Sequence, residues 1–517
     1  MWCIILLPLV LMLVFLPFGD MYRYKKSLES YRASGHSIHW EDVEARYTAG
    51  APEGENAAPQ LRVITKRLIE TNRRLVEEYG NRPKKTDVRT RRSNRPLSYL
   101  PVAGWQNSPW PSFQEPFSEE TMNDLVLLDA TFGTPLEELV SLKGKPAHYR
   151  LNFDPENPED LELPMFGETH FTVRFLIDWA LYRAESGDLG AALDCMETVL
   201  WLGRIQSTLP IAMGTMMTSN VHSSALRTTR FMMPRYAFGE EHYVRIASMF
   251  REQEQYIDMR AGLDGEFVLR EKGFLKSFET KEGGSGESAS KFGSTYSDKL
   301  DATFTDNVKH WTKEFADESW GYGDKMVSWR NRAYLMSKQR FVDQQWILSQ
   351  FKLIEERLDT EYENELPAEL RTHQDSQIEA EHHKNAVSIV SELRGVLWHT
   401  YYQRKELALA EIEASVFRYR AKLGIWPDSL KDVEKEFDLE FGKNPFTNKS
   451  FSLYSLDDGS EAWGIGVWKP RQELGVDVEH RYQFSTDVDE PMVDESSDRK
   501  EKDASATMDA LFGNEDR

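Results

Sequence analysis

The apolar run from Trp2 to Phe18 constrains this chain more than any other feature. It holds no charged or strongly polar side chain, so it lacks the polar face that a surface helix turns to water. At a rise of ~1.5 Å per residue it just spans a thin hydrocarbon core, and it ends at Pro17 and Gly19. It also lacks the basic start and small-residue cleavage site of a secretory signal peptide. The sequence therefore predicts a transmembrane anchor over residues 1–19, which contacts the lipid bilayer through residues 2–18.

The charges beside the anchor bear on its orientation. Four basic residues follow the apolar run and none precedes it: Arg23, Lys25, Lys26 and Arg32. Because basic flanks stay on the cytoplasmic side of a membrane, these charges alone would place the body in the cytoplasm.

Composition restricts the partners of the remaining chain. The 517 residues carry a formal net charge of −22, which repels nucleic acid, so no nucleic-acid partner is expected. Apolar residues make up 40% of the chain and charged residues 29%, which are values of a globular protein. The two cysteines are Cys3, in the apolar run, and Cys195, in a helix-like segment. They do not suffice for a zinc–thiolate cluster, and no metal or cofactor is expected.

Hydrophobic periodicity predicts a mainly α fold: a multi-helix soluble body behind one N-terminal transmembrane helix, then a small C-terminal α+β hairpin module and a disordered acidic tail. The predicted parts are the anchor (1–19), juxtamembrane helices and a basic loop (20–95), a helical domain with a hairpin at 169–204 (96–280), a flexible loop (281–299), a long-helix region (300–425), the α+β module (426–485) and the tail (486–517).

Within this plan the spacing of apolar residues places the individual elements. Helices are predicted over 22–31, 60–79, 122–132, 136–142, 209–233, 243–274, 329–362 and 378–423, and the hairpin breaks at Gly187-Asp188. Strands are predicted over 451–455 and 462–467, joined by a turn at 457–460.

Residues 209–233 are apolar enough to suggest a second membrane span. His222, Arg227 and Arg230 argue against that reading, as does the content of Ser and Thr. A buried helix of the body is therefore expected.

Four groups of residues are candidates for chemistry. Glu379, Glu381, His382 and His383 are the densest metal-ligand cluster, but the His-Glu-x-x-His spacing is absent, and an exposed helix face explains them. Glu168-Thr169-His170 is an acid–histidine pair that a helix start also explains. Asp457-Asp458-Gly459 suggests calcium, and a hairpin turn explains it equally.

The fourth group is basic. It suggests contact with phosphates or lipid head groups, and the alternative is a solvated loop whose charges pair with acids of the body. Its residues are Arg82, Lys84, Lys85, Arg89, Arg91, Arg92 and Arg95. Catalytic residues are not identified by any of these patterns.

Three segments together resemble a family of membrane-anchored proteins of planctomycetes and related bacteria, for which no activity is known. These segments are Gly54–Pro59, the Ala180–Leu202 hairpin with Gly187-Asp188, and the run from Phe417-Arg418-Tyr419-Arg420 through Gly424-Ile425-Trp426-Pro427-Asp428-Ser429-Leu430 to Asn444-Pro445-Phe446-Thr447. The resemblance implies a protein of the bacterial cytoplasmic membrane whose body lies outside the cytoplasm, opposite to the reading from the flanking charges. Both orientations stay open.

The last of these segments is also similar to the C-terminal part of type II secretion major pseudopilins, with a helix, a Trp-Pro turn and a small sheet. Asn444 stands where those proteins carry Asp, so the resemblance does not imply bound calcium. The anchor lacks the pilin-type leader, so assembly into a pilus is not expected.

Three functions follow as hypotheses. The first is a single-pass membrane-anchored helical scaffold or interaction protein of the bacterial envelope, with protein partners. The alternatives are an envelope hydrolase with an unrecognised site and a pseudopilin-like secretion accessory. Whether the chain is an enzyme stays open, and the patterns favour a protein without catalytic activity.

Overall fold

The computed structural model describes residues 19–49, 56–79, 116–149, 165–257, 259–276, 338–359, 387–445, 449–455, 461–467 and 477–484. Helices dominate them, which confirms the mainly α fold. Among the described residues, no helix combines the length and apolar character needed to cross a membrane. Four predicted features lie outside the described residues: the anchor run 2–18, the basic stretch 82–95, the loop 281–299 and the tail 486–517.

The described helices follow one another closely along the chain. A helix covers residues 19–33, and it is followed by α2 (Trp40–Thr48), α3 (Ala58–Tyr79), α4 (Glu119–Val140), α5 (Met165–Glu185), α6 (Leu189–Ser207), α7 (Ala212–Arg235), α8 (Glu240–Arg251), the short 3-10 helix η2 (Glu254–Tyr256), α9 (Arg260–Lys276), α13 (Lys338–Asp359), α16 (Val387–Leu423) and α17 (Leu430–Phe437).

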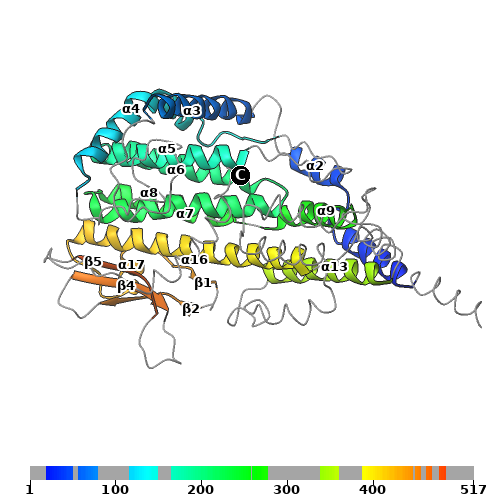
Figure 1. The fold of residues 1–517 in the computed structure, drawn as a ribbon. Coiled ribbons are helices and arrows are strands. Elements are labelled where there is room, and N and C mark those ends of the chain that lie inside the picture. The colour runs from blue at the N-terminus through cyan, green and yellow to red at the C-terminus, as the bar shows by residue number, and fades with distance from the viewer. Residues whose placement is uncertain are drawn as a thin grey trace, which may run out of the picture.

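These helices form a stack of layers (Figure 1). The pair α3 and α4 packs on α5 and α6, which pack on α7 and α8, and α16 covers the far side of α7 and α8. At one end of the stack α9 contacts α2, α7 and α13. At the other end α17 and the strands pack under α16.

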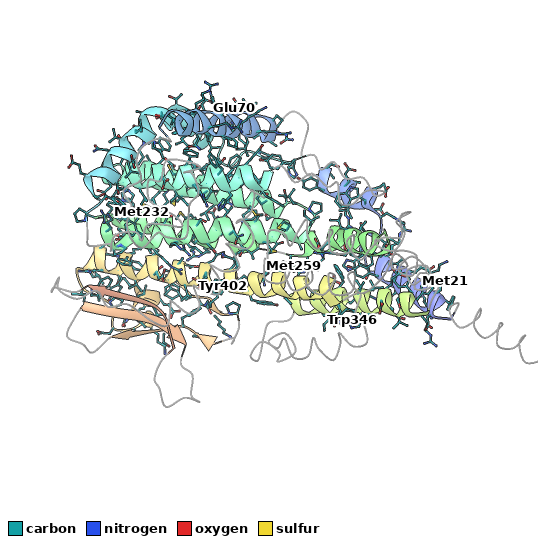
Figure 2. The ribbon with its side chains drawn as sticks, viewed as in Figure 1. Met21, Glu70, Met232, Met259, Trp346 and Tyr402 are labelled. Carbon is teal, nitrogen blue, oxygen red and sulfur yellow. The ribbon has the colours of Figure 1, made fainter. Side chains whose placement is uncertain are left out.

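Two apolar cores fill the stack, and α16 contributes to both. Its C-terminal half adds Leu409 and Val416 to a large core that reaches from α3 to α17. Its N-terminal half adds Val396 and Tyr401 to a smaller core with the 19–33 helix, α2, α9 and α13. Figure 2 shows Met232 inside the stack, where it is fully buried. One helix therefore joins two cores that share few other elements.

Several predicted boundaries are confirmed. Gly35, after the first helix, and Gly424, after α16, both have positive φ, which glycine adopts without strain. The predicted hairpin turn has Gly187 at φ 83°, and the Asp188 side chain accepts a hydrogen bond from the Ala191 amide at 3.1 Å, which caps α6. The Leu209–Met233 segment is the buried helix α7, as expected.

The two short helices predicted over 122–132 and 136–142 are wrong, because α4 runs unbroken through Pro135. Proline removes one backbone hydrogen bond inside a helix and crowds the preceding turn. The fully buried side chains of Phe132, Leu136 and Leu139 continue across the proline on one face. Their packing outweighs the local cost of the proline.

The single helical segment predicted over 243–274 is also wrong. It divides into α8, η2 and α9, and the described residues between α8 and α9 (252–257 and 259) form a turn that contains η2. Ile257 and Met259 are buried in this turn, so it belongs to the body. Because these two turn residues are apolar, the average hydrophobicity of the segment does not fall at the turn. The sequence pattern therefore gives no sign that the helix breaks there.

The C-terminal module has the predicted hairpin, a third strand beside it and a separate pair of short strands. Strands β3 (Ser452–Ser455) and β4 (Glu461–Val467) pair antiparallel, and β5 (Asp477–Phe484) pairs antiparallel with β4. A two-residue ladder joins β1 (Lys443–Asn444) to β2 (Lys449–Ser450). The alternation of Val478, Tyr482 and Phe484 was the available signal for β5.

Helix α9 approaches the α6–α7 connection closely because it carries glycines there. A Cβ at Gly265 would lie 1.7 Å from the Pro210 carbonyl oxygen, inside any allowed contact. The next residue, Glu266, accepts a hydrogen bond from the Ala212 amide at 3.1 Å and pairs with Arg270 at 2.5 Å. Helix α9 therefore satisfies a free amide at the start of α7 and fixes where α7 begins.

Substituting Gly265→Ala is expected to destabilise the protein, because the new methyl group must displace backbone rather than a flexible side chain. Overpacking of this kind costs at least ~1–3 kcal/mol of unfolding free energy. Gly167→Ala is the matched control, since Gly167 is helical and its Cβ would meet open space. Chemical denaturation should show a loss for the first variant and no loss, or a slight gain, for the second. Equal midpoints for the two variants would contradict the close approach.

Candidate functional site

Five residues from four segments meet at the end of the stack that contains the 19–33 helix. We call them the His36 cluster: His36 and Ser37 from the loop before α2, Arg46 from α2, Asp264 from α9 and Glu355 from α13. His36 and Asp264 are 228 residues apart in the chain. Only the packing of α9 against α2 and α13 brings them together.

The imidazole ring of His36 lies between two carboxylates. Its Nδ1 is 2.8 Å from Asp264 Oδ1, and its Nε2 is 2.8 Å from Glu355 Oε1. The ring also stacks on Tyr31, with centroids 4.0 Å apart and planes 4° from parallel. A neutral imidazole has one N–H donor and one acceptor nitrogen, whereas the imidazolium has two donors. The contacts therefore match the protonated ring.

The second oxygen of Asp264 completes the cluster. Oδ2 accepts from Arg46 Nη2 at 2.5 Å and from the Ser37 amide at 3.2 Å. Burial, and then the negative charges of Asp264 and Glu355, raise the pKa of the Tyr31 phenol, against the opposing effect of Arg46. The phenol therefore stays protonated beneath the ring.

The cluster contains a serine, a histidine and an aspartate, the residue types of a hydrolytic triad. Its contacts do not suit that chemistry. The Ser37 hydroxyl accepts a hydrogen bond from Arg46, and both ring nitrogens of His36 face carboxylates. The ring has no nitrogen left to take a proton from the hydroxyl, so the arrangement joins segments of chain instead.

A second group, the Arg230 cluster, lies between α7 and α16. Arg230 donates from Nε to Glu413 Oε2 and from Nη1 to Glu406 Oε2, both at 2.7 Å. Lys405 Nζ lies 3.3 Å from the other oxygen of Glu406. The side chains of Glu413 and Glu406 are only 0% and 7% exposed, so these charges are paired inside the protein. Two positive and two negative groups meet there.

A third group, the Arg245 cluster, joins α6 and α8 to the chain after α4. Arg245 donates to Glu197 at 2.7 Å and to Asp194 at 2.6 Å, and Lys143 lies 2.8 Å from Asp194. Burial alone would raise the pKa of Glu197, but the hydrogen bonds from Arg245 and Lys143 hold it below its usual range. The carboxylates of this cluster are therefore charged at neutral pH and bind three elements together.

The predicted acid–histidine pair is a helix start. Glu168 lies in the first turn of α5, where burial raises its pKa against the opposing charges of Arg62 and Lys66. Burial, and then the charge of Arg174, lowers the pKa of His170 to about 3. The alternative that a helix start explains these residues is confirmed.

The other predicted candidates lie outside the described residues: Glu379, Glu381, His382 and His383, and the Asp457-Asp458-Gly459 turn. In the described part of the chain, no group of three or more His, Cys, Asp and Glu residues suits a metal ion.

Two further buried groups in the described body are neutral. His222 of α7 packs against α6, where a Cβ at Gly203 would lie 2.7 Å from its Nε2. Burial, and then the charge of Arg204, lowers the pKa of His222 to about 3. Burial raises the pKa of the fully buried Cys195 thiol, so this cysteine is a core residue and not a nucleophile.

None of the three clusters was predicted from the sequence. His36 lies shortly before α2 in the chain, but no local pattern links it to Asp264 or Glu355. Arg230 was singled out only as an argument against a membrane span. In the structure Arg230 pairs with the buried Glu406 and Glu413, and α7 is not apolar enough to cross a membrane.

Comparison of the chain with protein-family models, curated proteins and solved structures found no match. The likeness to planctomycete envelope proteins and to pseudopilins therefore stays a prediction from the motifs.

Substituting Arg230→Met is expected to lower the free energy of unfolding by ~3–5 kcal/mol, because it removes the cation between two buried glutamates. Arg227→Met on the same helix is the control, since Arg227 is exposed and surface changes stay within ~0.5 kcal/mol. Denaturant titration of the two variants measures the difference. A similar small loss for both would show that the cluster does not hold α7 to α16.

Proposed function

We propose that this protein is a single-pass membrane-anchored helical scaffold of the bacterial envelope that holds protein partners at a set place relative to the bilayer. One observation supports it above the others. The 19–33 helix, which follows the apolar run, and the C-terminal module lie at opposite ends of the helical stack (Figure 1).

Helix α16 is the element that would keep those ends apart. It has 37 residues, which gives a length of ~55 Å, and it contacts α7, α8, α13, α17 and β1. Its two halves belong to different cores, and the Arg230 cluster ties it to α7. A helix held along its length by packing and buried ion pairs has the stiffness that a spacer needs.

The proposed anchor is the run 2–18, which lies outside the described residues. We place the protein in the cytoplasmic membrane with its body outside the cytoplasm, following the family resemblance. The basic residues after the anchor favour the opposite orientation, and protease treatment of intact cells and spheroplasts distinguishes the two.

A pseudopilin-like secretion accessory is the second candidate. The order of elements favours it: the long helix α16 is followed by Trp426-Pro427, α17 and a three-stranded antiparallel sheet. The module also packs on the body, since Trp426 lies 5.5 Å from Phe417 of α16, ring to ring. An envelope hydrolase is favoured less, because the His36 cluster uses its ring nitrogens in ion pairs.

The anchor and spacer are tested together by spin labels at Tyr22 and Ile425, which are 67% and 62% exposed. In full-length protein reconstituted into vesicles that carry a nickel-chelating lipid, the label at Tyr22 should relax strongly. The label at Ile425 should not, because the body holds it away from the lipid. A variant without residues 2–18 should fail to float with the vesicles.

Two outcomes contradict this proposal. Weak relaxation at both labels would mean that the run 2–18 does not hold the chain in the bilayer. Strong relaxation at both would mean that the body lies along the membrane and does not act as a spacer.

The partner-holding role is tested by a photo-crosslinking amino acid at Ile425 in cells that produce the full chain. A discrete crosslinked protein, recovered repeatedly from this site, is expected. Val244 on α8, which is 42% exposed and lies on the body, is the matched control site. Identical products from both sites, or none from either, would count against a partner at the C-terminal end.

A further inference from the structure

We propose that the His36 cluster is a protonation-dependent latch: the imidazolium form of His36 fastens the segment after the 19–33 helix to α9 and α13, and loss of its proton releases one side. This inference goes beyond the proposed scaffold function and does not depend on it, because it rests only on contacts within the described residues.

The reason lies in the number of donors. With both carboxylates ionised, the two 2.8 Å contacts of His36 each need an N–H, and only the imidazolium supplies two. After deprotonation, one ring nitrogen presents a lone pair to a carboxylate oxygen. That contact then changes from a charge-assisted hydrogen bond to repulsion.

Asp264 and Glu355 differ in what else holds them. Asp264 is 11% exposed and also accepts hydrogen bonds from Arg46 and from the Ser37 amide. Glu355 is 29% exposed and faces the ring from α13. We therefore expect the neutral ring to keep its bond to Asp264 and to lose its bond to Glu355, so the release falls on the α13 side.

The other charged and titratable groups around the ring come from the same elements. Tyr31 of the first helix stacks under the ring, and Lys352 of α13 lies over the far part of the Tyr31 ring at 5.9 Å. Arg46 of α2 pairs with Asp264. Among the described residues, neither Arg46 nor Lys352 forms an ion pair with Glu355, and His36 is the group among these whose charge ordinarily changes between pH 5 and 8.

A second contact joins the same three helices without a histidine. The Tyr24 hydroxyl donates to Glu271 of α9 at 2.8 Å, and Gln344 of α13 donates to the same oxygen at 3.3 Å. This contact should hold the first helix on the body at both pH values. Deprotonation of His36 therefore weakens the contact with α13, while the 19–33 helix stays attached to α9 through Tyr24.

The test is hydrogen exchange of the full-length protein at pH 5 and pH 8, corrected for the intrinsic exchange rate. The amide of Ser37 donates to Asp264, so it exchanges only when the segment after the first helix detaches from α9, and losing the Glu355 contact makes that detachment easier. Its protection factor should fall by about tenfold from pH 5 to pH 8, as expected when one charge-assisted hydrogen bond is lost. The amide of Ala191, in the first turn of α6, should keep its protection factor.

Two substitutions separate the latch from a general loosening. Glu355→Gln keeps the size of the side chain but removes its charge, and it should abolish most of the pH dependence at Ser37. Glu356→Gln, at the next and exposed position of α13, should leave that dependence unchanged.

A measurement on the unmodified side chain keeps the inference testable if a variant fails to fold. Nitrogen NMR of the His36 ring should show two protonated nitrogens at pH 5 and one at pH 8. A ring that is neutral at pH 5, or a Ser37 protection factor equal at both pH values, would overturn the proposal.

Discussion

Two glutamates of α16 have almost no access to water, and the placement of that helix depends on how their charges are met. A buried carboxylate without a partner costs several kcal/mol, so Glu406 and Glu413 need the guanidinium of Arg230. Since these acids lie two turns apart on one face of α16, one arginine that binds both fixes the register of α7 against α16. Helix α7 is fixed in turn by α9, through Glu266 and the glycines beside it.

The contacts of α7 with its neighbours also explain how this apolar, Ser- and Thr-rich segment forms a core helix. Thr218 donates its hydroxyl hydrogen to the Gly203 and Gly214 carbonyls, both at 2.9 Å, and Gln403 of α16 donates to the Ser219 carbonyl at 2.7 Å. These polar groups of α7 find their partners within α7, on α6 and on α16. The interface therefore tolerates hydroxyl groups. Hydrogen bonds are directional, unlike apolar contacts, so they help to fix how the helices pack.

The sequence predicts those parts of the fold that depend on local pattern. Helix α3 follows from the spacing of Leu61, Ile64 and Leu68, all of which are buried, and the hairpin turn follows from Gly187-Asp188. Prediction fails where distant packing overrides local preference. Pro135 lies inside α4 because its neighbours fill a core, and β5 needs β4 as its partner.

The candidate site was beyond sequence reasoning for the same kind of reason. His36 shows no metal or catalytic spacing, and its partners come from helices that only the folded stack places beside it. What the sequence does supply is the frame: helical layers, a long final helix and a small module after Trp426-Pro427. The clusters around His36, Arg230 and Arg245 hold these helices together. They contain polar residues whose positions hydrophobic periodicity does not explain.

In the proposed scaffold, α16 makes the two cores one mechanical unit. Native-state hydrogen exchange along α16, followed through increasing denaturant, tests it most directly. The amides near Tyr401, in the smaller core, and those near Val416, in the larger core, should reach one common opening free energy and a common dependence on denaturant. If the Tyr401 half opens at much lower denaturant than the Val416 half, α16 joins two bodies that unfold independently, and the account of a rigid scaffold is wrong.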